Sequence, residues 1–187
     1  MSNYYFGALL PALTMQGPAP MSFADFVMLC NTHLPPADQQ AVSQLSSPTP
    51  VEYPANDLIA DWSNSETQLR NAVTRIRATR TEKDATQFLK THQSFSTSIE
   101  KGATDAFTKS TPLQREMALD AIRWEFLDEH AGLDQFATRA ILAYGLKLQI
   151  VERWAGLDDA AGRDAAESAM ALSSDDNNKN NAPEEEI

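Results

Sequence analysis

The spacing of apolar residues along this chain is mostly that of amphipathic helices. Between residues 57 and 80, five apolar side chains fall within roughly 60° of one another on a helical wheel. They are Leu58, Trp62, Leu69, Val73 and Ile76. Such a narrow stripe on a long segment predicts a helix that packs along one edge against a single partner helix.

Two later segments have wider apolar surfaces. Thr111, Pro112 and Gln114 predict a helix start, because they supply a cap, a proline in the first position and a capping-box partner. The helix that follows, to about residue 130, is apolar on two faces, which predicts a central place between neighbours. The next helix, 134–157, is apolar nearly all round and is expected to be mostly buried. The three tryptophans, Trp62, Trp124 and Trp154, each fall on an apolar face and should be mainly buried in one shared core.

The first third of the chain has shorter patterns. Residues 3–14 are apolar with a spacing that suits either a short extended segment or a helix. Ser22 is placed to cap a short helix, and Pro36 to open a second one that ends near residue 45. Residues 46–56 contain three prolines and are expected to form a loop.

The remaining segments have weaker signals. Residues 83–92 predict a short helix with a weak apolar face, whereas the Ser- and Thr-rich stretch 93–110 indicates no particular element. After residue 172 the chain is Ser, Asp, Asn and Glu with little to bury, a composition typical of disorder. We therefore expect an all-α fold, an elongated bundle of about six helices over 1–172, followed by a disordered acidic tail over 173–187.

The charge of the chain limits its partners. Among 187 residues there are 26 Asp and Glu against 15 Lys and Arg, and no basic residue precedes Arg70. This net charge of −11 disfavours nucleic acid and anionic membrane surfaces. The single cysteine, Cys30, rules out an intrachain disulfide and fits a reducing compartment. Residues 4–15 lack the basic start of a signal peptide, and no run approaches a membrane span, so we expect a cytoplasmic protein.

Patterns of catalytic or metal chemistry are not found. The histidines lie in three different predicted elements without ligand spacing, and there is neither a glycine-rich phosphate loop nor a nucleophile elbow. We expect no enzymatic activity, no metal, no cofactor and no small-molecule substrate. Five acidic residues share one predicted helix, and a carboxylate site for acid–base work stays an alternative to a charged helix surface. They are Glu116, Asp120, Glu125, Asp128 and Glu129.

Four residues are candidates for an interaction or a salt bridge. They are Arg70, Arg77, Arg80 and Asp120. The arginines belong to the only dense basic cluster, and Glu66 is spaced to pair with Arg70 along the helix. Asp120 lies on an apolar face and needs a cationic partner if it is buried. We expect Arg70 or Arg77 to bridge Asp120 inside the fold; the alternative is that the arginines dock an acidic partner.

Three segments carry a resemblance to a known family. The first is Asn3-Tyr4-Tyr5-Phe6 through Pro11, and the second runs from Trp62 through Arg75-Ile76-Arg77-Ala78. The third is Ile122-Arg123-Trp124, followed by Leu-Ala-Tyr-Gly-Leu-Lys-Leu-Gln at 142–149. In this order, over roughly residues 3–163, they resemble a bacterial family of uncharacterised function encoded in operons for V/A-type (vacuolar-type) ATPases. That family looks like the helical socket component of the rotary ATPase, designated C, or d in the eukaryotic enzyme, which is longer than this chain.

The resemblance implies a mechanical role in ion transport and ATP synthesis. The socket component sits on the membrane rotor ring and receives the central stalk, and it binds neither nucleotide nor metal. We therefore expect a non-catalytic stalk or rotor-coupling component, without direct membrane insertion, held at the inner membrane through the ATPase complex. An assembly or regulatory factor for the same ATPase is the alternative.

Overall fold

The computed structural model describes residues 4–47, 52–157 and 162. Over these residues the chain forms seven α-helices and one 3₁₀ helix, without a strand, so the all-α prediction is confirmed. The elements are α1 (Tyr4–Leu9), α2 (Phe23–His33), α3 (Pro36–Gln44), α4 (Asp57–Arg80), η1 (Thr86–Phe88), α5 (Thr97–Ala106), α6 (Pro112–His130) and α7 (Thr138–Ala155). The predicted tail, 173–187, lies outside the described residues.

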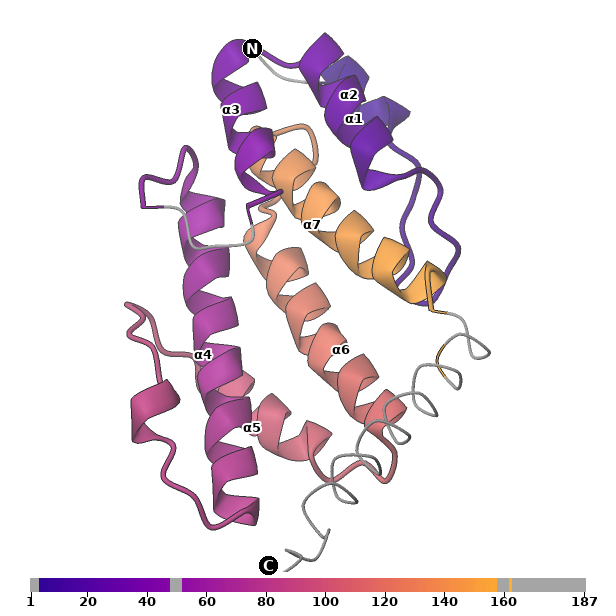
Figure 1. Cartoon of the computed structure of the whole chain (residues 1–187). Coiled ribbons are helices and arrows are strands. Elements are labelled where there is room, and N and C mark those ends of the chain that lie inside the picture. Colours follow the sequence, from indigo (N-terminus) through magenta and orange to yellow (C-terminus); the bar gives the residue numbers. More distant parts are fainter. Residues whose placement is uncertain (1–3, 48–51, 158–161, 163–187) are drawn as a thin grey trace, which may run out of the picture.

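Helix α6 runs through the middle of the molecule, with α4 on one side and α7 on the other (Figure 1). Helices α1, α2 and α3 gather at one end, where α2 and α3 pack on α7. Helix α5 lies toward the opposite end, against α4 and α6. The first turn of α6 and the last turn of α4 therefore lie far from α1.

Two hydrophobic clusters explain why α6 is central. The larger joins α1, α2, α3, the start of α4 and α7, and receives Leu127 from α6. The smaller joins α4 and α5, and receives Leu119 from α6. Helix α6 therefore contributes to both clusters, but the division does not follow the two predicted faces, because Phe126, expected on the face of Leu119, packs against the larger cluster. Trp62, Trp124 and Trp154 all pack against the larger cluster, although each side chain is only partly buried.

Capping side chains set several helix starts where the sequence predicts them. The Oγ of Ser22 accepts a hydrogen bond from the backbone N–H of Asp25 at 3.1 Å. Thr111 Oγ1 accepts one from the N–H of Gln114 at 3.2 Å. Each bond satisfies a donor that the first helical turn would otherwise leave free. Helix α4 begins and ends at the predicted residues, and Asn56 caps it.

The structure decides the form of the N-terminal segment, which the sequence left open, and it moves the start of α7. The apolar N-terminal segment is helical over Tyr4–Leu9 and continues as a loop. Helix α7 begins at Thr138 rather than at residue 134, because Asp134 Oδ1 accepts a 2.9 Å bond from the N–H of Phe136 and forms a turn. Gly132, at φ +84°, follows α6 in a left-handed conformation that suits glycine.

The helix predicted over 83–92 is wrong, since only the short η1 forms there. Asn71 of α4 is the reason, because its amide pairs with the backbone of Lys90 through an Nδ2–O bond of 2.6 Å and an N–Oδ1 bond of 3.0 Å. Gln68, 1% exposed, bonds the backbone of Ser96 in the same two ways, just before α5. These two amides hold residues 90–96 as irregular chain along α4 and position α5, a helix that the sequence pattern does not indicate.

Candidate docking surfaces

The buried carboxylate of Asp120 links three helices. Asp120 has no exposed surface and accepts hydrogen bonds from Arg123 Nη1 at 2.8 Å, from Arg153, and from Trp154 Nε1 at 2.7 Å. Arg123 also donates from Nε to Glu66 of α4 at 2.6 Å. Two carboxylates and two guanidinium groups therefore balance each other where α4, α6 and α7 meet.

The pKa of Arg123 follows from its two partners. Burial is the largest effect and lowers that pKa, but the charges of Glu66 and Asp120 and their hydrogen bonds together outweigh it. The pKa of Arg123 is therefore raised, and the group keeps its charge. Because every member of this network has a partner, the network serves to hold the helices together.

The expected bridge from Asp120 to Arg70 or Arg77 is wrong. Arg70 has a side chain 73% exposed and pairs with Glu66 at 3.6 Å, as the i,i+4 spacing predicts. Asp120 does have cationic partners, but they come from its own helix, one turn on, and from the end of α7. The packing angle of α7 on α6 brings Arg153 to Asp120, and a helical wheel of α6 carries no information on that angle.

Arg77 and Arg80 instead meet at a second place, which we call the Phe107 pocket. It is a cavity of about 290 Å³ lined by Arg77, Arg80, Thr81, Phe107, Pro112, Arg115 and Glu116. The ring of Phe107, 8% exposed, forms its floor. The guanidinium carbons of Arg77, Arg80 and Arg115 lie 5.9, 5.1 and 5.8 Å from the ring centroid, within the range of cation–π contacts.

The Phe107 pocket holds three arginines and one acidic side chain, Glu116, and none of these arginines forms an ion pair within the described part of the chain. Arg70 and Arg75 of α4 have carboxylate partners, but no ion pair forms at Arg77, Arg80 or Arg115 among the described residues. Arg80 donates to the carbonyl of Phe107 at 2.6 Å, and Arg115 to that of Lys109 at 3.2 Å. These bonds orient two guanidinium groups without cancelling their charge.

The helix dipoles explain part of this arrangement. Arg77 and Arg80 lie in the last turn of α4, where a cation is favourable against the negative end of the helix. Arg115 lies in the first turn of α6, which has no acidic residue and where a cation opposes the positive helix end. The pocket therefore lies between the negative end of α4 and the positive end of α6, and its attraction for anions comes from the three guanidinium groups.

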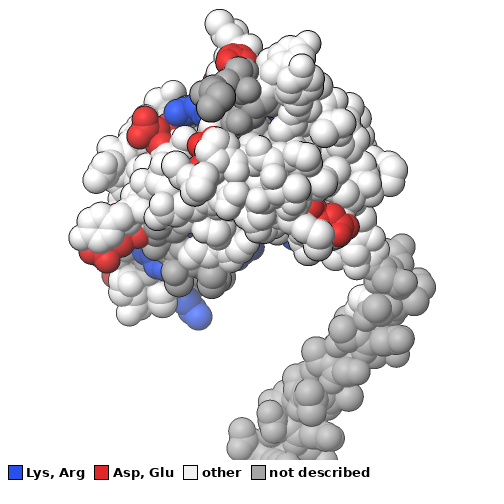
Figure 2. Space-filling model, turned by 90° about the horizontal axis from the view of Figure 1, so that it is seen from above, with Lys and Arg blue, Asp and Glu red and all other residues white. Residues whose placement is uncertain are grey.

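The opposite end of the molecule has different chemistry. Large apolar side chains stand exposed on α1 and α2 there: Tyr4, Tyr5, Leu9, Met28 and Leu29. Helix α1 is held in place by Phe6, which stacks on His33, and by Tyr4, whose ring lies 4.4 Å from that of Phe136. Seen from this end, most of the surface belongs to uncharged residues, with only scattered acidic and basic groups (Figure 2). We call this surface the uncharged end.

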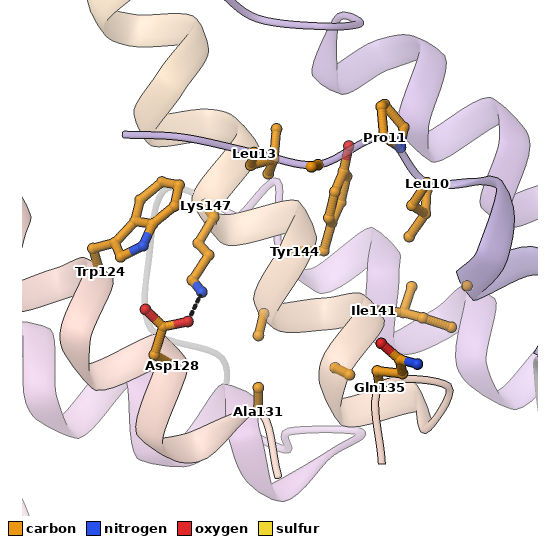
Figure 3. Close-up of a pocket in the computed structure, with 14 residues that line it drawn as sticks. Leu10, Pro11, Leu13, Trp124, Asp128, Ala131, Gln135, Ile141, Tyr144 and Lys147 are labelled. Atoms are coloured by element: carbon orange, nitrogen blue, oxygen red, sulfur yellow. Dashed lines mark hydrogen bonds and ion pairs between the residues drawn. The ribbon is translucent and has the colours of Figure 1, made fainter. Parts of the chain in front are cut away.

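A third feature is the cavity of about 320 Å³ between residues 10–13 and helices α6 and α7 (Figure 3). Lys147 reaches across it to Asp128, and its Nζ lies 4.9 Å from the ring centroid of Trp124. The hydroxyl of Tyr144 is buried without a hydrogen-bond partner among the described residues, and burial raises its pKa to about 12. The cavity thus holds one matched ion pair and a hydroxyl that keeps its proton.

The five acidic residues of α6 do not converge on one site. Asp120 is enclosed in its network, Asp128 pairs with Lys147, and Glu116 lines the Phe107 pocket. Glu125 and Glu129 are exposed and line a separate cavity of about 470 Å³. The described residues also contain no group of three or more His, Cys, Asp or Glu side chains that could hold a metal.

No helix in the described ranges is both long enough and apolar enough to cross a membrane. Residues 104–168 match a protein family described as a protein of unknown function (DUF2764). The match includes α6 and α7, hence Asp120, Arg123 and Arg153, together with Phe107 and Arg115 of the pocket. No curated protein and no solved structure matches the chain.

Proposed function

We propose that this protein is a non-catalytic docking component that binds an acidic protein surface through the Phe107 pocket. The observation that carries the proposal is the set of three guanidinium groups around one aromatic floor, without a carboxylate partner in the described chain. Arginine is the side chain best suited to such contacts, because its planar fork matches a carboxylate and its face stacks on an aromatic ring. Aromatic and arginine residues are also the most common anchors of protein interfaces.

The position of the surfaces suits a protein that links two partners. The Phe107 pocket lies where α4 ends and α6 begins, and the uncharged end lies across the molecule at α1 and α2 (Figure 1). One surface favours an acidic partner and the other an apolar one. A bundle with two dissimilar contact surfaces, joined by the buried Asp120 network, can transmit force between its partners without chemistry of its own.

The partner we propose is a bacterial V/A-type ATPase, in which the protein couples the central stalk to the membrane rotor ring. The support is the resemblance of three segments to the family encoded with such ATPases. Two of those segments contribute to the surfaces described above: the first contains Tyr4 and Tyr5 of the uncharged end, and the second contains Arg77 of the Phe107 pocket. In this role the protein is cytoplasmic and reaches the inner membrane only through the complex.

The test is the composition of the native ATPase, purified from cells that express defined variants of the full chain. We expect the wild-type protein to copurify at a fixed ratio to the rotor components. The double variant Arg77→Gln, Arg115→Gln should reduce its recovery at least tenfold at physiological salt, since it removes two of three charges from the pocket. Arg70→Gln, an exposed arginine of the same helix, is the matched control and should copurify normally.

Two other copurification results would change the proposed role. A protein that is absent from the mature ATPase, but present in partially assembled complexes, would be an assembly factor rather than a permanent component. A protein that associates with neither, or that turns over a substrate after rigorous purification and loses that turnover on mutation of Glu125 or Glu129, would overturn the proposal.

A further inference from the structure

We propose that the acidic C-terminal segment of the chain, residues 173–187, binds in the Phe107 pocket when no other protein occupies it. This segment contains one basic residue, Lys179, and five acidic ones: Asp175, Asp176, Glu184, Glu185 and Glu186. The pocket presents three cations, Arg77, Arg80 and Arg115, against one acidic side chain, Glu116, so its net charge is opposite to that of the segment. The contact itself does not depend on the proposed function; only its consequence for docking does.

The chain between α7 and the segment is long enough for the segment to reach the pocket. Ala155, at the end of α7, lines one cavity together with Met117 of α6. Met117 directly follows Glu116, which lines the Phe107 pocket. The described chain therefore leaves the helical body beside the first turns of α6. From Leu157 to Asp175 there are enough residues to span up to about 60 Å, whereas the whole of α6 is only about 28 Å long.

The chemistry of the two parts is complementary. A carboxylate can accept two parallel hydrogen bonds from one guanidinium group. Within the described residues, the guanidinium of Arg77 donates no hydrogen bond, and that of Arg115 donates only from Nε, to the carbonyl of Lys109. A tethered segment also meets its site at an effective concentration on the order of millimolar, so contacts too weak to bind a free peptide can persist within one chain. A more acidic protein surface would displace the segment from the pocket, so the segment would compete with the ATPase for this site.

The contact can be tested on the full chain with a spin label. Cys30 is buried and its thiol is protonated, so the variant Ser174→Cys places the one reactive thiol in the segment. A nitroxide at that position should broaden the backbone amide signals of Arg80, Phe107 and Arg115 at low salt. The signal of Met28, at the uncharged end, is the internal control and should be unaffected. At about 1 M salt, where charges are screened beyond about 3 Å, the broadening should fall to the control level.

Two further variants separate the pocket from a general attraction. Combining the label with Arg77→Gln and Arg115→Gln should reduce the broadening at least fivefold, whereas Arg70→Gln should leave it unchanged. Replacing the five acids of the segment by their amides should have the same effect as the pocket variant, and it leaves the helical body untouched. Broadening that is absent in the wild-type chain, or that survives in either neutralised variant, would overturn the proposal.

The intramolecular contact and binding to the ATPase are measured by separate experiments. The spin-label measurement needs only the isolated chain. If both hold, the full chain with the neutralised segment should bind the ATPase several-fold more tightly than wild type. Broadening without any ATPase binding would remove the proposed function and leave the intramolecular contact standing. ATPase binding without broadening would do the reverse.

Discussion

The indole Nε1 of Trp154 donates a 2.7 Å hydrogen bond to the carboxylate of Asp120, which lies on the neighbouring helix without exposed surface. The two residues lie at the end of α7 and in the middle of α6. The bond joins the helices at the level where Arg123 and Arg153 neutralise the carboxylate. This junction ties α6 to α7 through polar contacts.

Replacing Asp120 by alanine should destabilise the protein strongly. The change removes one of the two carboxylates that pair with Arg123, whose side chain is mostly buried. Breaking a buried ion pair from one side costs about 3–5 kcal/mol. Arg70→Ala removes a cation whose side chain is 73% exposed and should cost under about 1 kcal/mol. Urea unfolding of both variants measures the difference. Equal small losses would mean that the Asp120 network does not hold the helices.

The ion pair between Asp120 and Arg153 can be tested by a double-mutant cycle. Asp120→Ala combined with Arg153→Ala should be clearly less destabilising than the sum of the two changes, because the pair is in direct contact. Asp120→Ala combined with Arg70→Ala should show much weaker coupling, since Arg70 reaches Asp120 only through Glu66 and Arg123. Coupling to Arg70 in place of Arg153 would contradict the packing of α7 on α6.

Gly145 is predicted to be a packing requirement of α7. A Cβ at this position would lie 2.6 Å from Cε1 of Phe26 and 3.0 Å from Cδ1 of Leu45. Gly145→Ala should therefore destabilise the protein by about 1–3 kcal/mol, although alanine is the better helix former. Gly156→Ala is the matched control, because its Cβ would come no closer than 3.5 Å to another atom. Thermal unfolding of the two variants compares them, and a stabilising Gly145→Ala would refute the close packing of α2 on α7.

Cys30 should be unreactive in the native protein. Burial raises the pKa of its thiol from 9.0 to about 12, which lowers the thiolate population on the order of 1,000-fold near neutral pH. The folded chain keeps this proton more tightly than the unfolded chain does. The contribution to stability is therefore complete below about pH 9 and is lost as the pH rises toward about 12. Reaction with an aromatic disulfide reagent at pH 8 should be slow, and fast once denaturant unfolds the chain; fast native reaction would disprove the burial.

Tyr144→Phe should leave the protein as stable or make it more stable. The hydroxyl of Tyr144 is buried without a hydrogen-bond partner among the described residues, so its removal should raise the free energy of unfolding by up to about 1 kcal/mol. Tyr53→Phe, at a side chain 79% exposed, is the control and should change nothing. Denaturant unfolding at pH 7 measures both. A loss above about 1 kcal/mol for Tyr144→Phe would mean that the hydroxyl has a partner.

The helices themselves could be predicted because their signals are local. The bounds of α4 and the starts of α2 and α6 follow from apolar spacing and from capping residues within three positions of each start. The two apolar faces of α6 likewise indicated its central place. The need of Asp120 for a cation also followed from the sequence, since a carboxylate on an apolar face cannot be buried alone.

Which groups meet across helices was decided only by the tertiary structure. Arg153, one of the two cationic partners of Asp120, is 33 positions away from it. Gln68 and Asn71 set the path of residues 90–96 through bonds to backbone atoms. Phe107, a single aromatic residue after α5, showed no pattern that marks it as the floor of an arginine cluster. Apolar periodicity specifies which face of a helix is buried. The angle and height at which two helices cross depend on all the side chains between them, and these decide which charges are neutralised and which stay available to a partner.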